Sequence, residues 1–211
     1  MTPTRHQGPR AALWWLPVGA GGHFVIHTSQ WWESYHARRE HRPPRPLFHA
    51  ALEVHIDSST LHVIEMAPAW GHDGASHGVM MTGPVGLRCL GRSRLFRYEV
   101  RCWRNGTIPD KQEAPAPPST FPLDLTGALA LIARVADVPQ HTWGRDAFGT
   151  GDMWNSNSVI SWLLLTSGID AADLNPPMGG AAPGWAAGIS AAERPPGTPI
   201  RPEPPQGPHL G

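Results

Sequence analysis

The strongest constraint on the fold is a strict two-residue alternation in the stretch LFHAALEVHID, residues 47–57. One set of alternate positions is apolar, and the other carries mostly polar or titratable side chains. The first set is Phe48, Ala50, Leu52, Val54 and Ile56, and the second is His49, Ala51, Glu53, His55 and Asp57. Because successive side chains of a strand point to opposite faces, this pattern predicts a strand with one face in a core.

Further strands are expected on both sides of this one. The polar turn DSST, residues 57–60, links it to LHVIEMA, residues 61–67, which predicts a hairpin. The segments GGHFVIHTSQ, GVMMTG, GLRCLG and LFRYEVRCW, at 21–30, 78–83, 86–91 and 95–103, are also typical of strands. The middle third of the chain is therefore expected to form an antiparallel sheet.

Helical patterns come only late in the chain. Residues 124–138, DLTGALALIARVADV, have apolar residues at helical spacing behind a cap at Asp124 or Thr126. A second helix is expected to start near Asn155 and to end at Gly168, a residue type favoured just past a helix end. Strands first and helices last predict an α+β fold, with an antiparallel β-sheet packed against C-terminal helices.

The 211 residues are long enough for one domain with a substantial core. We expect a flexible N-terminal arm over 1–12, one domain over 13–190 with a loop at 104–122, and a disordered Pro-rich tail over 191–211. Lys plus Arg and Asp plus Glu balance at 17 each, so nucleic acid is not an expected partner. No apolar run reaches the roughly 18 residues that a transmembrane helix needs.

Cysteines and histidines do not form a pattern typical of metal sites. Cys89 and Cys102, both in expected strands, could form one disulfide or remain thiols, which leaves the redox compartment open. In a strand, His23 and His27 would lie about 13 Å apart, too far to share one ion. No metal and no cofactor is therefore expected.

The candidate site combines a helix start with strand histidines. Ser156 lies at the beginning of NSNSVISWLL, residues 155–164, where free N–H groups and the helix dipole stabilise an anion. His49 lies on the polar face of the alternating strand, and His62 follows thirteen residues later on its neighbour. A hydrolase of papain type needs a helix-start nucleophile, a strand histidine as base, and a polar residue that orients this histidine.

The same stretch resembles the Asn-Cys-Asn/Glu-x-Phe helix start of circularly permuted papain-like enzymes. These include NlpC-type, lecithin-retinol-acyltransferase-like and desumoylating-isopeptidase-like groups, in which the histidine strand precedes the nucleophile helix. The resemblance implies a permuted papain-like fold, with His49 as the base, His62 as the orienting residue and Ser156 at the cysteine position. It also implies that Asn155, Asn157 and Ser158 form the motif around the oxyanion. Glu53 or Glu65 could orient His49 instead of His62.

A second resemblance is to a bacterial domain family of unknown function with the motif Gly-Pro-Asn-Ser-Asn-Thr-Phe. The counterparts here are NSNSVI, RYEVRCW and NPPMGG, at residues 155–160, 97–103 and 175–180, within a likeness over about residues 85 to 190. Met-Trp replaces the Gly-Pro, and Val159 replaces the phenylalanine. This resemblance implies that a serine at position 156 is the family's own residue.

These observations lead to several functional hypotheses. The first is an amide or ester hydrolase, or an acyltransferase-like domain, with serine in place of cysteine and a peptide or acyl-lipid substrate. In the second, Asn155 or Ser156 only caps the helix, and the domain is a non-enzymatic binding module with a groove lined by Trp154 and Trp162. The third is an exported toxin-like effector that acts on peptidoglycan or lipid. Without export a cytoplasmic location is the default, and the sequence does not fix the oligomeric state.

Overall fold

The computed structural model describes residues 8–19, 37–38, 41–69, 78–108 and 110–194. The expected strand at 21–30 lies outside these residues, as do residues 1–7 of the expected arm and 195–211 of the expected tail. Within the part that is described, no helix is long and apolar enough to cross a membrane.

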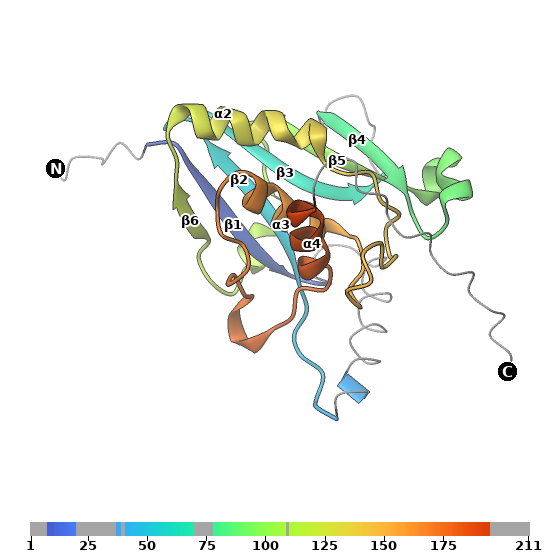
Figure 1. Cartoon of the computed structure of the whole chain (residues 1–211). Helices are drawn as coiled ribbons and strands as arrows, with labels where there is room; N and C mark the ends of the chain where they lie inside the picture. The colour runs from blue at the N-terminus through green and yellow to red at the C-terminus, as the bar shows by residue number, and fades with distance from the viewer. Residues whose placement is uncertain (1–7, 20–36, 39–40, 70–77, 109, 195–211) are drawn as a thin grey trace, which may run out of the picture.

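Six antiparallel strands form one sheet (Figure 1). Its strands in chain order are β1 (Arg10–Pro17), β2 (Phe48–His55), β3 (Leu61–Pro68), β4 (Val79–Pro84), β5 (Arg97–Arg104) and β6 (Ser119–Pro122). Their order across the sheet is β4-β5-β3-β2-β1-β6. The predicted hairpin is confirmed, since β2 pairs with β3, and Asp57 Oδ1 accepts the Ser59 and Thr60 N–H groups in the turn.

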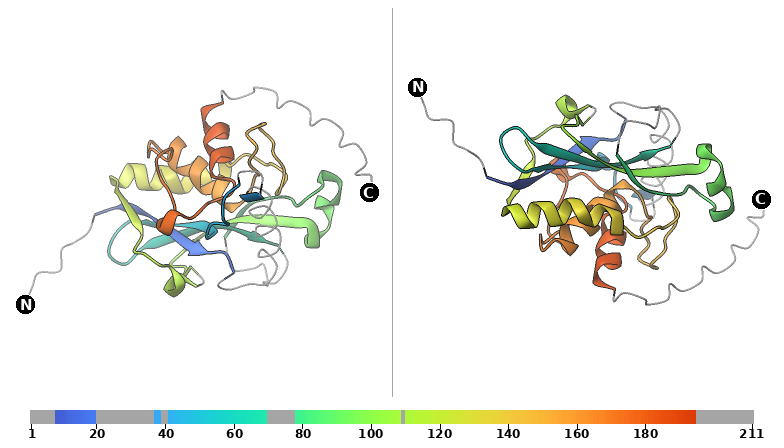
Figure 2. Two further views of the ribbon diagram at one scale, coloured as in Figure 1. Left: turned by 90° about the horizontal axis from the view of Figure 1, so that it is seen from below. Right: turned by 90° about the horizontal axis from the view of Figure 1, so that it is seen from above.

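Three α-helices of the described residues pack on this sheet, and Figure 2 shows them on one of its faces. They are α2 (Leu125–Arg134), α3 (Ser156–Thr166) and α4 (Trp185–Glu193). The opposite face carries the loop with the short 3-10 helix η3 (Lys111–Glu113). The described residues also form the 3-10 helices η1 (Arg88–Arg92), η2 (Arg94–Phe96), η4 (Val135–Asp137) and η5 (Pro177–Gly179). The expected α+β class is confirmed.

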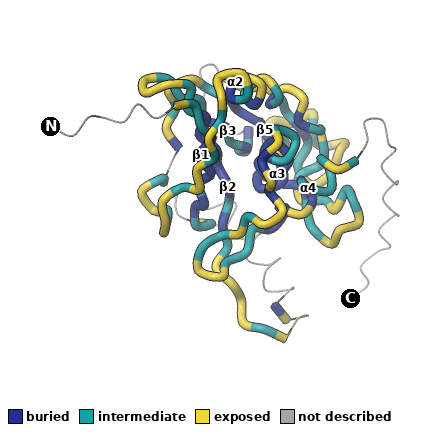
Figure 3. The backbone as a smooth tube through the Cα atoms, turned by 60° about the vertical axis from the view of Figure 1, so that its left-hand side comes forward, coloured by how far each residue is buried: buried dark blue, intermediate teal, exposed yellow. Residues whose placement is uncertain are grey.

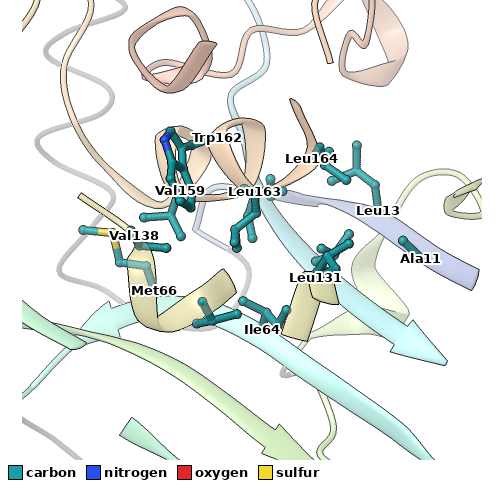
Figure 4. Packing of buried hydrophobic residues seen from close by; sticks show 14 of the residues in the cluster. Ala11, Leu13, Ile64, Met66, Leu131, Val138, Val159, Trp162, Leu163 and Leu164 are labelled. Atoms are coloured by element: carbon teal, nitrogen blue, oxygen red, sulfur yellow. The ribbon is translucent and has the colours of Figure 1, made fainter. Parts of the chain in front are cut away.

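The alternation in β2 places its side chains as predicted. Phe48, Ala50, Leu52 and Val54 belong to the main core between the sheet and the helices. Figure 4 shows Ile64 and Met66 of β3 meeting Val159 and Leu163 of α3 in this core. Ala51, from the other set, lies in a smaller apolar cluster on the opposite face with Leu16, Val63 and Ile108.

Helix α3 is buried on all sides, which is unusual for a helix in a small domain. All residues from Ser156 to Leu164 are buried. Figure 3 shows α3 dark blue between the sheet and the other helices, whereas α2 has an exposed side. A helix that is apolar around its circumference is expected to be central in its domain. The four polar residues at its start are therefore buried too.

Three expectations about boundaries and elements were wrong. Strand β1 begins at Arg10, inside the expected arm, because Arg10–Pro17 pairs with the whole of β2. Residues 86–91 do not form a strand: Gly86, with φ of 72°, turns the chain away from the sheet, and η1 follows. Helix α4 was not predicted and runs to Glu193, beyond the expected domain end at 190.

Candidate active site at the start of helix α3

The asparagines and serines at the start of α3 first cap the helix itself. Asn155 is the N-cap residue, and its side-chain oxygen accepts the Asn157 N–H at 2.9 Å. In return, the Ser158 hydroxyl accepts the Asn155 N–H at 3.0 Å. This reciprocal arrangement is a capping box, which satisfies N–H groups that a helix start otherwise leaves without partners.

Asn157 connects the helix start to strand β2. Its Oδ1 accepts the Ala50 N–H at 2.7 Å, and its Nδ2 donates to the Phe48 carbonyl at 3.0 Å. This edge of β2 is available because β2 pairs with β3 only over Leu52–His55. The Asn157 amide therefore replaces a neighbouring strand at the two peptide groups that flank His49.

The same polar motif holds the entry to α4. Asn155 and Asn157 both donate to the Pro183 carbonyl at 2.8 Å, and the Ser158 hydroxyl donates to the Gly184 carbonyl at 2.7 Å. Both amide hydrogens of Asn157 are thus engaged. The expectation that Asn157 forms part of an oxyanion site is wrong for its side chain, and the side chains of Asn155 and Ser158 also serve the packing of α3.

Ser156 differs from these three neighbours. The residue is 8 % exposed, and its hydroxyl makes no hydrogen bond to any residue that the structure describes. Its backbone N–H, in the first turn of α3, likewise has no partner in the described part of the chain. The side chains of Asn155, Asn157 and Ser158 therefore have structural partners, and among the described residues the Ser156 side chain has none.

His49 is adjacent to this helix start. By strand alternation its side chain leaves β2 on the face of Ala51, away from the main core. Burial lowers its pKa, and the Ala50 carbonyl and the Asp110 carboxylate oppose this effect without cancelling it. In a strand, the N–H and C=O of one residue point to the same side, so the Ala50 carbonyl lies at the edge where Asn157 binds. Burial therefore favours the neutral form of the imidazole, and the carbonyl that opposes this effect lies at that same edge.

No hydrogen bond joins the Ser156 hydroxyl to His49 among the described residues. The contacts that link the two regions are those of Asn157, which follows Ser156, with the peptide groups on either side of His49. Catalytic hydrogen bonds are often long or poorly aligned when no substrate is bound. Asn157 thus brings the start of α3 to the backbone of β2, whereas the His49 side chain leaves β2 on the face away from the main core. A working Ser156–His49 pair therefore stays a prediction.

The predicted role of His62 is wrong. His62 pairs with Val54, five residues along β2 from His49, which corresponds to about 17 Å. Its ring lies on the main-core side, because Ile64 and Met66 of the same alternate set are core residues. Its Nδ1 is buried without a hydrogen-bond partner, and burial lowers its pKa. His62 cannot orient His49 from this position.

The other two candidates for an orienting residue are committed elsewhere. Glu53 accepts hydrogen bonds from Lys111 Nζ at 2.6 Å and from Trp14 Nε1 at 3.0 Å. Glu65 lies 3.9 Å from Arg101, and burial raises its pKa. Asp110 is the carboxylate whose charge acts on His49. Sequence reasoning missed Asp110, because only the folded position of the loop before η3 brings it to β2.

The remaining predictions about ligands have mixed outcomes. Trp154 is 0 % exposed and Trp162 is buried, so the groove that these two residues were expected to line is filled by core packing. Cys89 and Cys102 are free thiols, and Cys89 lies in η1 rather than in a strand. No group of three metal-ligating side chains occurs in the described ranges, and His23 and His27 lie outside them.

No family model, no curated protein and no solved structure matches this chain. Inference about its function therefore depends on the geometry of the α3 start. That geometry offers a serine hydroxyl and an N–H group without a partner among the described residues at a helix N-terminus. The neighbouring strand carries a histidine whose pKa is lowered by burial and raised by the charge of Asp110. Chemically, these are the elements of nucleophilic acyl transfer.

Proposed function

We propose that this protein is an amide or ester hydrolase, or an acyltransferase, of permuted papain-like type, with Ser156 as the nucleophile. The observation that carries the proposal is the pair of bonds from Asn157 to the Ala50 N–H and the Phe48 carbonyl. These bonds fix the residue after Ser156 onto the residues on either side of His49. A helix-start nucleophile beside a strand histidine, with the strand first in the chain, agrees with the permuted papain-like arrangement.

The proposed reaction follows from the groups at this site. His49 takes the Ser156 hydroxyl proton as the oxygen attacks a substrate carbonyl, and the resulting oxyanion is stabilised by the Ser156 N–H and the positive end of α3. The imidazolium then gives this proton to the leaving amine or alcohol, which leaves an acyl-serine. Water, or an acceptor hydroxyl or amine, releases the acyl group with His49 as base again. Asp110 stabilises the imidazolium.

Substrate alignment is part of this proposal, since Ser156 and His49 are not hydrogen-bonded to each other without substrate. Peptides, including those of peptidoglycan, and acyl lipids are the substrate classes that the resemblance implies. A base that is well positioned contributes roughly 10²–10⁴-fold to such a reaction. Activity of this domain therefore depends on whether binding turns the imidazole toward the serine.

The second candidate is a non-enzymatic binding module on the same scaffold. Two observations favour it: Ser156 and His49 share no hydrogen bond in the described chain, and the other motif residues serve structural contacts. In this alternative the motif NSNS is retained because it caps α3 and docks α4. Both candidates predict the same fold and differ only in the reactivity of Ser156.

A fluorophosphonate probe and a panel of acyl esters distinguish the two. We expect wild-type protein to be labelled, Ser156→Ala to lose labelling, and the exposed-serine control Ser119→Ala to keep it. Persistent labelling of Ser156→Ala would contradict the proposal. No reaction in wild type but reaction in Ser156→Cys would show a disarmed site, and no reaction in wild type, Ser156→Ala or Ser156→Cys would support the binding module.

A further inference from the structure

A second surface, distant in sequence from the α3 start, has a composition that suggests a ligand. The turn between β4 and β5, residues 85–96, leaves the end of the sheet as η1 and η2 (Figure 1). Its sequence, VGLRCLGRSRLF, contains Arg88, Arg92 and Arg94 and no acidic residue. All three arginines are exposed. We call residues 85–96 the basic turn.

A pocket with a volume of about 410 Å³ opens beside the basic turn. Arg88, Arg92 and Arg97 line it together with Thr82 and Gln140, and its lining includes no acidic side chain. The Arg97 guanidinium is held in place, because its Nε donates to the Gly91 carbonyl at 3.1 Å and one terminal nitrogen donates to the Arg92 carbonyl at 3.1 Å. A fixed guanidinium is pre-organised for an anion.

The positive charge of this pocket is not neutralised within the described chain. No described carboxylate lies within ion-pair distance of Arg88, Arg92 or Arg97. The charge also affects a neighbouring group: burial lowers the pKa of His141 to about 4, and Arg88 and Arg194 contribute to this decrease. Arginine groups without carboxylate partners in a concave site are suited to a phosphate group, which they bind through paired N–H donors.

Large apolar side chains on the same turn indicate what carries the phosphate. Leu87, Leu95 and Phe96 are 48 %, 65 % and 43 % exposed. A small soluble phosphate compound would not require exposed leucine and phenylalanine around its site. Apolar side chains beside cationic ones are the combination that binds the interface of an anionic membrane, where charge and acyl chains meet.

We propose that the basic turn binds an anionic phospholipid at a membrane surface. The pocket arginines hold the lipid phosphate, and Leu87, Leu95 and Phe96 enter the boundary between headgroups and acyl chains. This contact is peripheral and needs no membrane-spanning segment. The inference does not depend on Ser156, because the basic turn would bind the membrane whether or not the α3 site is reactive.

Co-sedimentation of the full chain with vesicles tests this inference. We expect binding to vesicles of phosphatidylcholine mixed with phosphatidylglycerol, little binding to phosphatidylcholine alone, and weaker binding as salt increases. The double variant Arg88→Gln/Arg92→Gln should bind about 30-fold more weakly, since each cation near an anionic surface contributes about a factor of five. Leu95→Ser should lower the affinity about tenfold.

Arg104→Gln is the matched control, because Arg104 is exposed but lies in β5 outside the pocket lining. It should bind vesicles like wild type, and all variants should keep the wild-type circular dichroism spectrum and unfolding midpoint. Equal binding of the double variant and wild type would overturn the proposal, as would equal binding to both vesicle types. Glycerol phosphate that protects the protein thermally, with no vesicle binding, would overturn the lipid assignment in favour of a soluble phosphate compound.

Discussion

Asn157 forms hydrogen bonds with both peptide groups that flank His49, through the Ala50 N–H and the Phe48 carbonyl. One side chain thereby sets the depth and the register of α3 on β2. It also takes the place of a neighbouring strand at residues 48–51 of β2, which do not pair with β3. The Asn157 side chain serves the structure, whereas the Ser156 hydroxyl has no structural partner among the described residues. Mutation of Asn157 should therefore lower stability, and mutation of Ser156 should affect reactivity.

Asn157→Ala should lower the free energy of unfolding by about 2–4 kcal/mol, because the Ala50 N–H and the Phe48 carbonyl would be left buried without partners. Urea unfolding followed by tryptophan fluorescence measures this loss. Asn175→Ala is the control, since Asn175 is exposed and bonds only to the nearby Asp173 carbonyl. Its effect should stay within about 0.5 kcal/mol. Equal effects of the two variants would mean that the Asn157 contacts do not anchor α3.

Asp110→Asn should lower the pKa of His49 further, because the Asp110 charge favours the protonated imidazole. Titration of the His49 ring proton by NMR measures this directly and does not depend on activity. If Ser156 is active, the acidic limb of its rate profile should move to lower pH as well, since the neutral base persists further into acid. Asp137→Asn, at an exposed position in η4, should leave both unchanged.

His141 should make the fold less stable in acid. Its pKa is about 4 in the folded protein against 6.5 for the ordinary group, so the unfolded state binds more protons between these values. Neutral His141 makes its full contribution to the free energy of unfolding above pH 6.5, the pKa of the group in the unfolded chain. This contribution is lost as the pH falls toward the pKa of about 4 in the folded protein. We expect a loss of about 1–3 kcal/mol between about pH 7.5 and about pH 4, after allowance for solvent screening.

Urea unfolding at several pH values compares wild type with His141→Phe, in which the pH-dependent loss should be smaller by this amount. Phenylalanine can keep the edge contacts, since the His141 ring lies 4.9 Å from Phe148 and 4.7 Å from Trp154, centroid to centroid. Identical pH dependence of the two proteins would show that His141 does not cause the acid sensitivity.

The parts of the fold that sequence could predict are those set by local patterns. The alternation in β2 correctly predicted which of its side chains enter the core, and the DSST turn correctly predicted the hairpin. Asn155 and Gly168 correctly predicted where α3 begins and ends. Each of these features acts within a few residues. The strand expected at 86–91 failed for a local reason as well, because the positive φ of Gly86 redirects the chain into η1.

The candidate site was only partly predictable, because it depends on contacts between distant segments. The register of the hairpin could have excluded His62 as the residue that orients His49. Leu52 lies opposite Ile64, and the same register continued along β2 places Ala67 opposite His49, whereas His62 lies opposite Val54. Asp110 could not be found, since its effect on His49 depends on how the loop after β5 folds over β2. Helix α4 was hidden by the prolines and glycines around it, although its own sequence, WAAGISAAE, is rich in alanine.

Gly188 in α4 should tolerate no side chain, because α3 and α4 are in direct backbone contact there. A Cβ at Gly188 would lie 2.1 Å from both the Ser158 carbonyl oxygen and the Ser161 hydroxyl oxygen. The Ser161 hydroxyl also donates to the Trp185 carbonyl at 2.8 Å, which holds the two helices at this separation. Gly188→Ala should therefore cost about 2–4 kcal/mol, despite the better helix propensity of alanine.

The matched control is Gly127→Ala in α2, a second helical glycine whose surroundings are more open. A Cβ there would lie 3.0 Å from the Asp124 side-chain oxygen and 3.8 Å from Leu123 Cδ2, with no backbone atom from outside its own helix nearby, so its effect should stay within about 1 kcal/mol, with the propensity gain opposing the contact. Thermal and urea unfolding of both variants measure the difference. Equal stability of Gly188→Ala and Gly127→Ala would contradict the prediction. It would mean that α4 can shift away from α3 at little cost, so that the hydrogen bonds from Ser158 and Ser161 do not fix the separation of the two helices.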